Sequence, residues 1–178
     1  YCSLFRSGGQ LIGFMGILIQ RPKWKGQNHL LIQLGETIIL EDFRGQGLLQ
    51  MTILQLGCLF WRAVLSGKVF CWANAYTYKS YLAFAKSVDH FYPNYQEATP
   101  YHIKDLMDFV GGQHFNEQYE VPLGIVKNDR LSLKDNSDRI CYKYQEEPHI
   151  RFFSEINPGY ETGNGLITIA PLNRKNIS

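Results

Sequence analysis

The sequence lacks the short motifs that mark several enzyme and metal-binding classes. Its five histidines form no i, i+4 pair and no Glu-x-x-His pattern, and its four cysteines have no Cys-x-x-Cys spacing, so no metal site is predicted. There is no Gly-x-Ser-x-Gly elbow, which removes the basis for a serine hydrolase. The main glycine turn is not followed by Lys and then Ser or Thr, which excludes a P-loop.

Strong charge and uninterrupted apolar runs are also lacking. A net charge of +2 with 19% charged residues gives no broad basic field, so nucleic acid is not expected as a partner. The short basic cluster at 21–25 is interpreted as a solvated loop between strands, with an anionic substrate as the alternative. Polar residues interrupt the apolar run 48–65, and no signal peptide is visible. We therefore expect no membrane span and a cytoplasmic protein.

The cysteines do not suggest a disulfide framework. Their spacing is irregular and two of them lie in strongly apolar stretches, which predicts reduced, buried thiols: Cys2, Cys58, Cys71 and Cys141. Cys71 stays open as an alternative nucleophile. With 178 residues and 45% apolar content, the chain is long enough for one sizeable core, and we expect a single domain over 1–178.

The most informative stretch is a strand, a glycine turn and a helix in succession. The apolar run 30–40 predicts a buried strand, and apolar residues at three-to-four spacing over 48–65 predict a helix. Gly45 and Gly47 between them allow a ligand to approach the backbone, and the first helical amides lack intrahelical partners. Such a turn favours a pyrophosphate. A dinucleotide-binding fingerprint needs a third glycine and an acidic residue about 20 positions later, and both are missing.

These residues resemble the coenzyme A turn of the GNAT N-acyltransferase superfamily. The family pattern is Arg or Gln, two free positions, Gly, one free position, then Gly or Ala; Arg44 and Gly47 match it, with Phe43 as the aromatic residue before the arginine. Leu49 departs from it, because the family usually has a small residue there. The resemblance covers residues 10–92.

The resemblance implies an α/β (α+β) fold, with a mixed, mostly antiparallel central sheet flanked by helices. Residues 1–92 would form the cofactor-binding core, and 93–178 would be family-specific. In the family a strand and one or two helices precede the first hairpin. We therefore expect those N-terminal elements to be missing from this chain.

The function implied is transfer of an acyl group from acetyl-CoA or a longer acyl-CoA to an amine acceptor, by direct attack on the thioester and without a metal. An acyl carrier protein is the alternative donor. Leu49 and Phe84 both depart from the family, so a non-catalytic binding or regulatory protein on the same scaffold is the competing interpretation.

Ten residues are candidates for binding the coenzyme. A backbone amide near the end of the strand would receive the thioester oxygen, and the turn would receive the pyrophosphate. The candidates are Ile39, Leu40, Glu41, Arg44, Gly45, Gln46, Gly47, Leu48, Leu49 and Asn74.

Glu36 is the candidate base for the amine proton. It stands inside an apolar strand, where loss of solvent would raise its pKa toward the working range. Strand alternation equally allows Glu36 to face water. Glu41 and His29 are the next candidates.

Tyr81 is the candidate proton donor for the departing thiolate. The family's usual tyrosine is replaced by Phe84, whose ring has no proton to give. Tyr76 and Tyr78 are alternatives, as is departure without a protein donor. Aromatic packing is the competing role for each of these tyrosines.

Further elements follow from local patterns. Strands are predicted at 1–6, 10–19 and 68–73. The segment 80–86 resembles the second cofactor helix of the GNAT superfamily, so the resemblance implies a helix there. Pro100 predicts a helix start, and Gly111-Gly112 predicts its end. Beyond it we expect a mobile loop over 129–147, then strands at 150–156 and 165–172 that complete the sheet as a hairpin.

Overall fold

The computed structural model describes residues 1–128, 140, 146–173 and 175–176. These residues pack into two compact units, and each is treated separately below. The first unit comprises Tyr1–Ala73, Lys86–His90 and Ala170–Ser178; the second comprises Asn74–Ala85 and Phe91–Ile169. Each unit therefore contains segments from both sides of residue 92.

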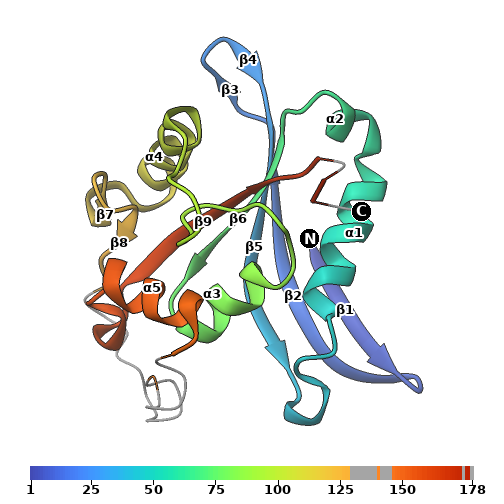
Figure 1. Cartoon of the computed structure of the whole chain (residues 1–178). Coiled ribbons are helices and arrows are strands. Elements are labelled where there is room, and N and C mark those ends of the chain that lie inside the picture. The colour runs from blue at the N-terminus through green and yellow to red at the C-terminus, as the bar shows by residue number, and fades with distance from the viewer. Residues whose placement is uncertain (129–139, 141–145, 174, 177–178) are drawn as a thin grey trace. The chain divides into compact units, whose positions relative to one another are not determined.

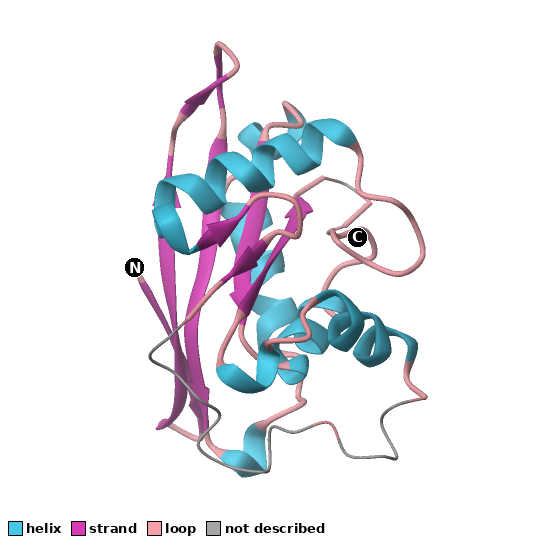
Figure 2. Ribbon diagram, turned by 90° about the vertical axis from the view of Figure 1, so that its left-hand side faces the viewer, coloured by secondary structure: helices cyan, strands magenta, loops and turns pink. Residues whose placement is uncertain are grey.

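The first unit is built on long strands (Figures 1 and 2). Its elements are β1 (Cys2–Ser7), β2 (Gln10–Gln20), β3 (Lys23–Trp24), β4 (Gln27–Asn28), β5 (Leu30–Ile39), a 3-10 turn (Glu41–Phe43), α1 (Leu48–Leu59), α2 (Trp61–Leu65) and most of β6 (Val69–Ala75). β1, β2 and β5 are antiparallel neighbours, and β6 pairs with β5 in parallel. Strands β3 and β4 form a separate two-stranded hairpin.

The predicted helix over 48–65 is two helices rather than one. The backbone of Phe60 has φ −106° and ψ 23°, outside the helical range, so α1 ends at Leu59 and α2 begins at Trp61. Both helices place apolar side chains in the core, among them the fully buried Ile53. Gly67, at φ +69°, ends α2 as predicted.

The second unit combines three helices with short strands. Its elements are the last residues of β6, α3 (Tyr78–Ala85), α4 (Tyr101–Phe115), a 3-10 turn (Asn116–Gln118), β7 (Tyr119–Glu120), β8 (Ile125–Val126), α5 (Pro148–Ile156), a 3-10 turn (Tyr160–Thr162) and most of β9 (Gly165–Pro171). β8 pairs antiparallel with both β7 and β9.

The predicted fold class is confirmed. The hydrogen-bonded strands follow the order β1-β2-β5-β6-β9-β8-β7, and β6 and β9 each continue from one unit into the other. The described pairs of this sheet are antiparallel except β5 with β6. Helices accompany the strands, as the mixed α/β prediction requires.

The predicted strand at 150–156 is wrong, because this segment is helix α5. Glu147 caps the helix: its Oε2 accepts a hydrogen bond from the amide of Ile150, at 2.7 Å. Pro148 occupies the first helical turn, where its missing N–H costs nothing. Ile150 and Phe153, three positions apart, are the buried pair, which is helical rather than strand spacing. The expected hairpin of 150–156 with 165–172 therefore does not form.

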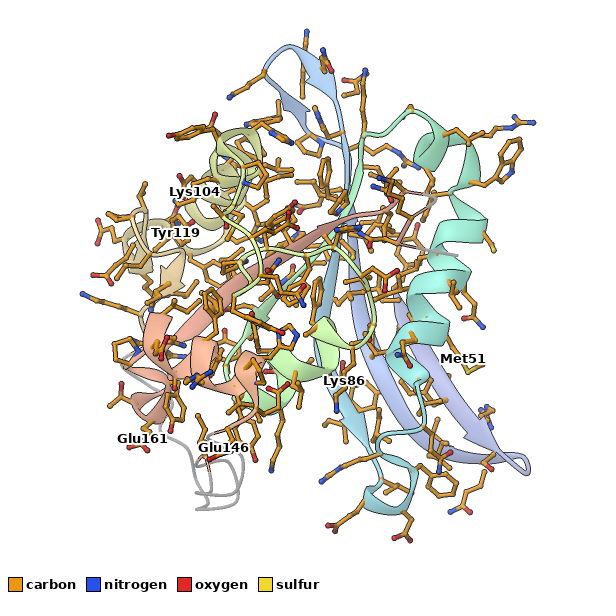
Figure 3. The ribbon with its side chains drawn as sticks, in the orientation of Figure 1. Met51, Lys86, Lys104, Tyr119, Glu146 and Glu161 are labelled. Atoms are coloured by element: carbon orange, nitrogen blue, oxygen red, sulfur yellow. The ribbon has the colours of Figure 1, made fainter. Side chains whose placement is uncertain are left out.

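The predicted helix stop at Gly111-Gly112 is also wrong, because α4 continues to Phe115. Gly111 is buried against Tyr119, and a Cβ at this position would lie 2.4 Å from the tyrosine ring. Glycine is present for close packing, and not as a terminator. Tyr119 is held there by a 2.7 Å hydrogen bond from its hydroxyl to Asp108, which also pairs with Lys104 (Figure 3).

Two further expectations concern the loop and the thiols. Most of the expected loop over 129–147 lies outside the described residues, as does Cys141. Cys71 is buried as predicted, whereas Cys2 on β1 and Cys58 on α1 are exposed. Within the described chain, no helix is long and apolar enough to cross a membrane.

Candidate functional site

The predicted glycine turn is present between β5 and α1, within the first unit. Gly45 and Gly47 both have φ +75°, a left-handed conformation that residues with a side chain rarely adopt. Gly47 is the residue that precedes the helix, and the carbonyl of Gly47 accepts the amide of Met51 at 2.9 Å. The chain therefore reverses from strand to helix within a few residues, and it needs glycine to do so.

The N-terminus of α1 is open. No side chain in the described part of the chain caps it, and its first turn has no acidic residue. The amides of Leu48, Leu49 and Gln50 belong to the first helical turn, where no intrahelical acceptor exists. These donors, together with the positive end of the helix dipole, make the turn a suitable site for an anion.

Arg44 ties this turn to the end of β5. Its Nε donates a hydrogen bond to the carbonyl of Ile39, at 3.1 Å, and the side chain is exposed. The amide of Leu40 donates to the carbonyl of Ile12 on β2, at 2.9 Å. Gln46 Nε2 donates to the carbonyl of Asp42, at 3.2 Å. The predicted turn residues therefore lie together, with the guanidinium group on the solvent side.

Gln50 connects the helix start to a distant part of the chain. Its Nε2 donates to the carbonyl of Lys86, which belongs to the first unit although it follows α3 in sequence. A Cβ at Gly47 would lie 2.8 Å from Gln50 Oε1, so the glycine also makes room for this amide. Lys86 (labelled in Figure 3) was not among the predicted site residues, because only the tertiary structure brings 86 beside 50.

Among the described residues, the strand that leads into the turn has an edge with no neighbouring strand, which we call its free edge. The parallel ladder joins Leu30–Gln33 to Val69–Trp72 and ends there, while β5 continues to Ile39. Over its last part, β5 is paired on the other side only, with Gly13–Ile17 of β2. An extended ligand can hydrogen bond to such an edge as an added strand would.

The three candidate bases lie in different places. Glu36 is exposed on the free part of β5, so the burial expected for it inside an apolar strand is not present. Glu41 is exposed directly before the turn. His29 is buried at the opposite end of β5, with its ring against Trp24 at 5.2 Å and its Nδ1 3.1 Å from the carbonyl of Gln27. His29 is thus about 30 Å of strand away from the turn, which removes it as a base there.

The candidate tyrosines belong to the second unit. Tyr81 is fully buried, and its hydroxyl donates to the carbonyl of Pro93 at 3.0 Å. Burial is the main cause that raises its pKa, and the nearby Glu147 adds to it. Its ring packs against Phe91 and Phe153, at centroid distances of 5.6 Å and 5.4 Å. The packing role therefore describes Tyr81 better than the predicted role of proton donor.

The other α3 residues give a similar result. Tyr78 and Phe84 are buried, and the Phe84 ring lies 6.0 Å from that of Phe91. Tyr76 precedes the helix and is half-buried.

Asn74, also in the second unit, has an unusual environment. Both polar atoms of its carboxamide are buried, and neither has a hydrogen-bond partner. Gly165 faces it, and a Cβ there would lie 2.0 Å from Asn74 Oδ1. An unpaired donor and acceptor in one buried amide are costly, and no described residue satisfies them.

Cys71 does not have the environment of a nucleophile. It is fully buried in β6, and burial raises the pKa of its thiol to about 12. The described residues contain no group of three or more metal-ligating side chains.

Comparison with known proteins gives structural matches only. No model of a known protein family matches the chain, and no curated protein does so. A structure of an AtaT mutant toxin with the C-terminus of the antitoxin AtaR and acetyl-CoA matches at 19% identity and TM-score 0.33, over 43% of this chain and 50% of that one. The chain thus spans about half the length of that protein.

Two other structures match to a similar extent. The KacTA–DNA complex matches at 20% identity and TM-score 0.33, over 43% of this chain and 48% of that one. Arabidopsis thaliana Naa50 in complex with the bisubstrate analogue CoA-Ac-MVNAL matches at 10% identity and TM-score 0.38, over 56% and 66%. The matches are partial and the identities low.

Proposed function

We propose that this chain binds acyl-CoA at the turn between β5 and α1 and transfers the acyl group to an amine. One observation carries the proposal: helix α1 begins after a left-handed Gly47, and no described side chain caps its first amides. The pyrophosphate of coenzyme A has the charge and the acceptor oxygens that such a helix start binds. The resemblance of this stretch to the GNAT superfamily supports the same ligand.

The free edge of β5 fits the remainder of the coenzyme. Beyond Gln33, one side of the strand has backbone groups with no partner in β6, and this edge leads directly to the turn. A chain with amide groups, such as pantetheine, would pair with that edge while its phosphates reach Gly47. The same geometry suits a pantetheine arm on an acyl carrier protein, which stays the alternative donor.

The chemistry needs a neutral amine and a site for the proton that it loses. We propose that Glu36 accepts this proton, because it is exposed on the free part of β5, where an amine substrate can reach it from solvent. Tyr81 is not assigned as the donor to the thiolate, because its hydroxyl is already bound to Pro93.

The test is calorimetric titration with acetyl-CoA and a long-chain acyl-CoA, on the wild type and on Gly47→Glu. The glutamate places a negative charge at the proposed phosphate position, and we expect binding to fall by more than about 100-fold. Gly67→Glu is the matched control, because Gly67 has φ +69°, open surroundings and a place in the same unit after α2. Equal affinity of wild type and Gly47→Glu would remove the site.

Turnover is a separate question. Glu36→Gln is expected to slow acyl transfer and to flatten its pH profile, with coenzyme binding kept. If acyl-CoA binds at the turn and no amine is acylated, the alternative of a non-catalytic binding protein replaces the enzyme.

A further inference from the structure

The first unit is basic, although the whole chain is almost neutral. Its segments hold ten Lys and Arg residues against four Asp and Glu residues, whereas the second unit holds eight against twelve. Residues 1–35 and 43–73 contain no acidic residue. The net charge of +2 conceals this separation, and the first unit attracts anions by itself.

Many of the positive charges lie on or beside the hairpin of β3 and β4. Arg21, Lys23 and Lys25 are exposed, and Lys25 Nζ lies 4.9 Å from the centre of the Trp24 ring. The hairpin turns through Lys25 and Gly26, which both have positive φ. The hairpin forms its own two-stranded sheet and extends beyond the start of β5 (Figure 1).

Helix α2 reaches the same end of the sheet. The hairpin leads into β5 at Leu30, and α2 leads through Gly67 to Lys68 and β6. The amide of Leu30 donates to the carbonyl of Lys68, at 2.8 Å, so the two connections are adjacent. We call the surface made by residues 21–28 and 59–68 the basic end.

Large apolar side chains accompany these charges. The exposed fractions of Leu59, Trp61 and Leu65 are 69%, 54% and 54%. Arg62 lies over the Trp61 ring, with its Cζ 5.3 Å from the ring centre. Exposed leucine and tryptophan beside lysine and arginine, with no acidic residue, is the composition of segments that lie in a membrane interface.

The acidic residues of this unit are elsewhere. Three of the four, Glu36, Glu41 and Asp42, lie in the last part of β5 or directly after it, and the fourth, Asp89, lies in the segment Lys86–His90. A strand rises about 3.3 Å per residue, so even Glu36 is about 20 Å from the start of β5, and these three carboxylates are separated from the hairpin by more than a Debye length at physiological salt. The glycine turn lies at the acidic end as well.

We propose that the basic end docks on an anionic lipid surface, without crossing it. The phosphate groups of the lipid complement Arg21, Lys23 and Lys25, and the headgroup region receives Leu59 and Leu65. Nucleic acid would also attract the charges, but it provides no apolar layer for the two leucines. Docking in this way leaves the turn at the other end of β5 in solution.

The experiment is sedimentation of the full chain with vesicles of phosphatidylcholine alone and with phosphatidylglycerol added, at low and at physiological salt. We expect binding only when phosphatidylglycerol is present, and weaker binding as salt rises. Removal of one charge by Lys23→Gln should weaken binding about fivefold. Arg6→Gln removes one charge from the β1–β2 hairpin, at the other end of the sheet, and should change binding less than twofold.

The apolar part has its own pair of variants. Leu65→Gln should weaken binding to the vesicles about tenfold. Leu11 has a similar exposed fraction of 48% but lies outside the basic end, so Leu11→Gln should not weaken binding. Brominated lipids should quench Trp61 fluorescence more in the wild type than in Leu65→Gln. Coenzyme titration of the same variants separates this inference from the proposed function, because it should be unchanged.

Four results would overturn the proposal. They are equal binding to both vesicle types, binding to neither, equal losses for Arg6→Gln and Lys23→Gln, and displacement from vesicles by an equal mass of an RNA or DNA oligonucleotide. The last result would assign the basic end to nucleic acid.

Discussion

Gly45 and Gly47 both have a positive φ, yet alanine should affect them differently. Each φ is +75°, so an added side chain strains the backbone at both positions. A Cβ at Gly45 meets nothing within 4 Å, whereas a Cβ at Gly47 lies 2.8 Å from Gln50 Oε1. The amide of Gln50 is also the donor to the Lys86 carbonyl. Alanine at 47 should therefore disturb that hydrogen bond as well.

The magnitudes follow from these two contributions. A left-handed conformation costs a residue with a side chain about 1 kcal/mol, which is the whole effect expected for Gly45→Ala. Loss of an exposed hydrogen bond adds about 0.5–1 kcal/mol, so Gly47→Ala should cost about 1.5–2 kcal/mol. Gln50→Ala should cost about 0.5–1 kcal/mol alone. The double variant Gly47→Ala, Gln50→Ala should cost no more than Gly47→Ala alone, because the hydrogen bond from Gln50 to Lys86 can be lost only once.

The assay is urea unfolding of the wild type, the three single variants and the double variant, with the m-value of each compared. Two results would refute the reasoning. One is a double variant whose cost equals the sum of the single costs within about 0.3 kcal/mol. The other is a Gly45→Ala variant that is less stable than Gly47→Ala.

Three further predictions concern residues away from the turn. Gly111→Ala should destabilise the protein by about 1–3 kcal/mol, because its methyl group meets the fixed Tyr119 ring. Gly112→Ala in the same helix meets nothing within 4 Å and should stabilise the protein by about 0.5–1 kcal/mol; thermal unfolding of the two variants checks both values. Burial raises the pKa of Cys71 to about 12 from 9.0, so its contribution to stability is present below pH 9 and decreases above it, by at most about 1.4 kcal/mol per pH unit. The loss of stability between pH 9 and 10 should be smaller in Cys71→Ala, and an equal loss would contradict this. Tyr81→Phe should lower the free energy of unfolding by about 1–2 kcal/mol and leave kcat within twofold, and a large loss of kcat would restore Tyr81 as a proton donor.

Local patterns were sufficient for the parts of the chain that depend on near neighbours. The strand at 30–39, the glycine turn and the helix start follow from apolar periodicity and from the conformations that glycine allows. The first hairpin follows from alternation and from the turn at Gly8 and Gly9, which both have positive φ.

Local patterns failed where a residue outside the segment decides the outcome. The segment 150–156 has apolar residues that suit a strand or a helix, and the cap provided by Glu147 favours the helix. Gly111 predicts a helix end from its sequence alone, but in the structure the Tyr119 ring occupies the space that a side chain at 111 would need. Sequence spacing does not report a partner eight residues away in another element.

For the candidate site, the sequence by itself determined the turn, since Arg44, Gly45 and Gly47 lie within four consecutive residues and their backbone conformation is a local property. The tertiary structure alone decided that Gln50 reaches Lys86, that the β5–β6 ladder ends at Gln33, that Glu36 faces solvent and that Tyr81 is bound to Pro93. The physical reason is that burial and hydrogen-bond partners depend on which strands and helices become neighbours. Those neighbours are fixed by long-range pairing and not by the order of residues along one element.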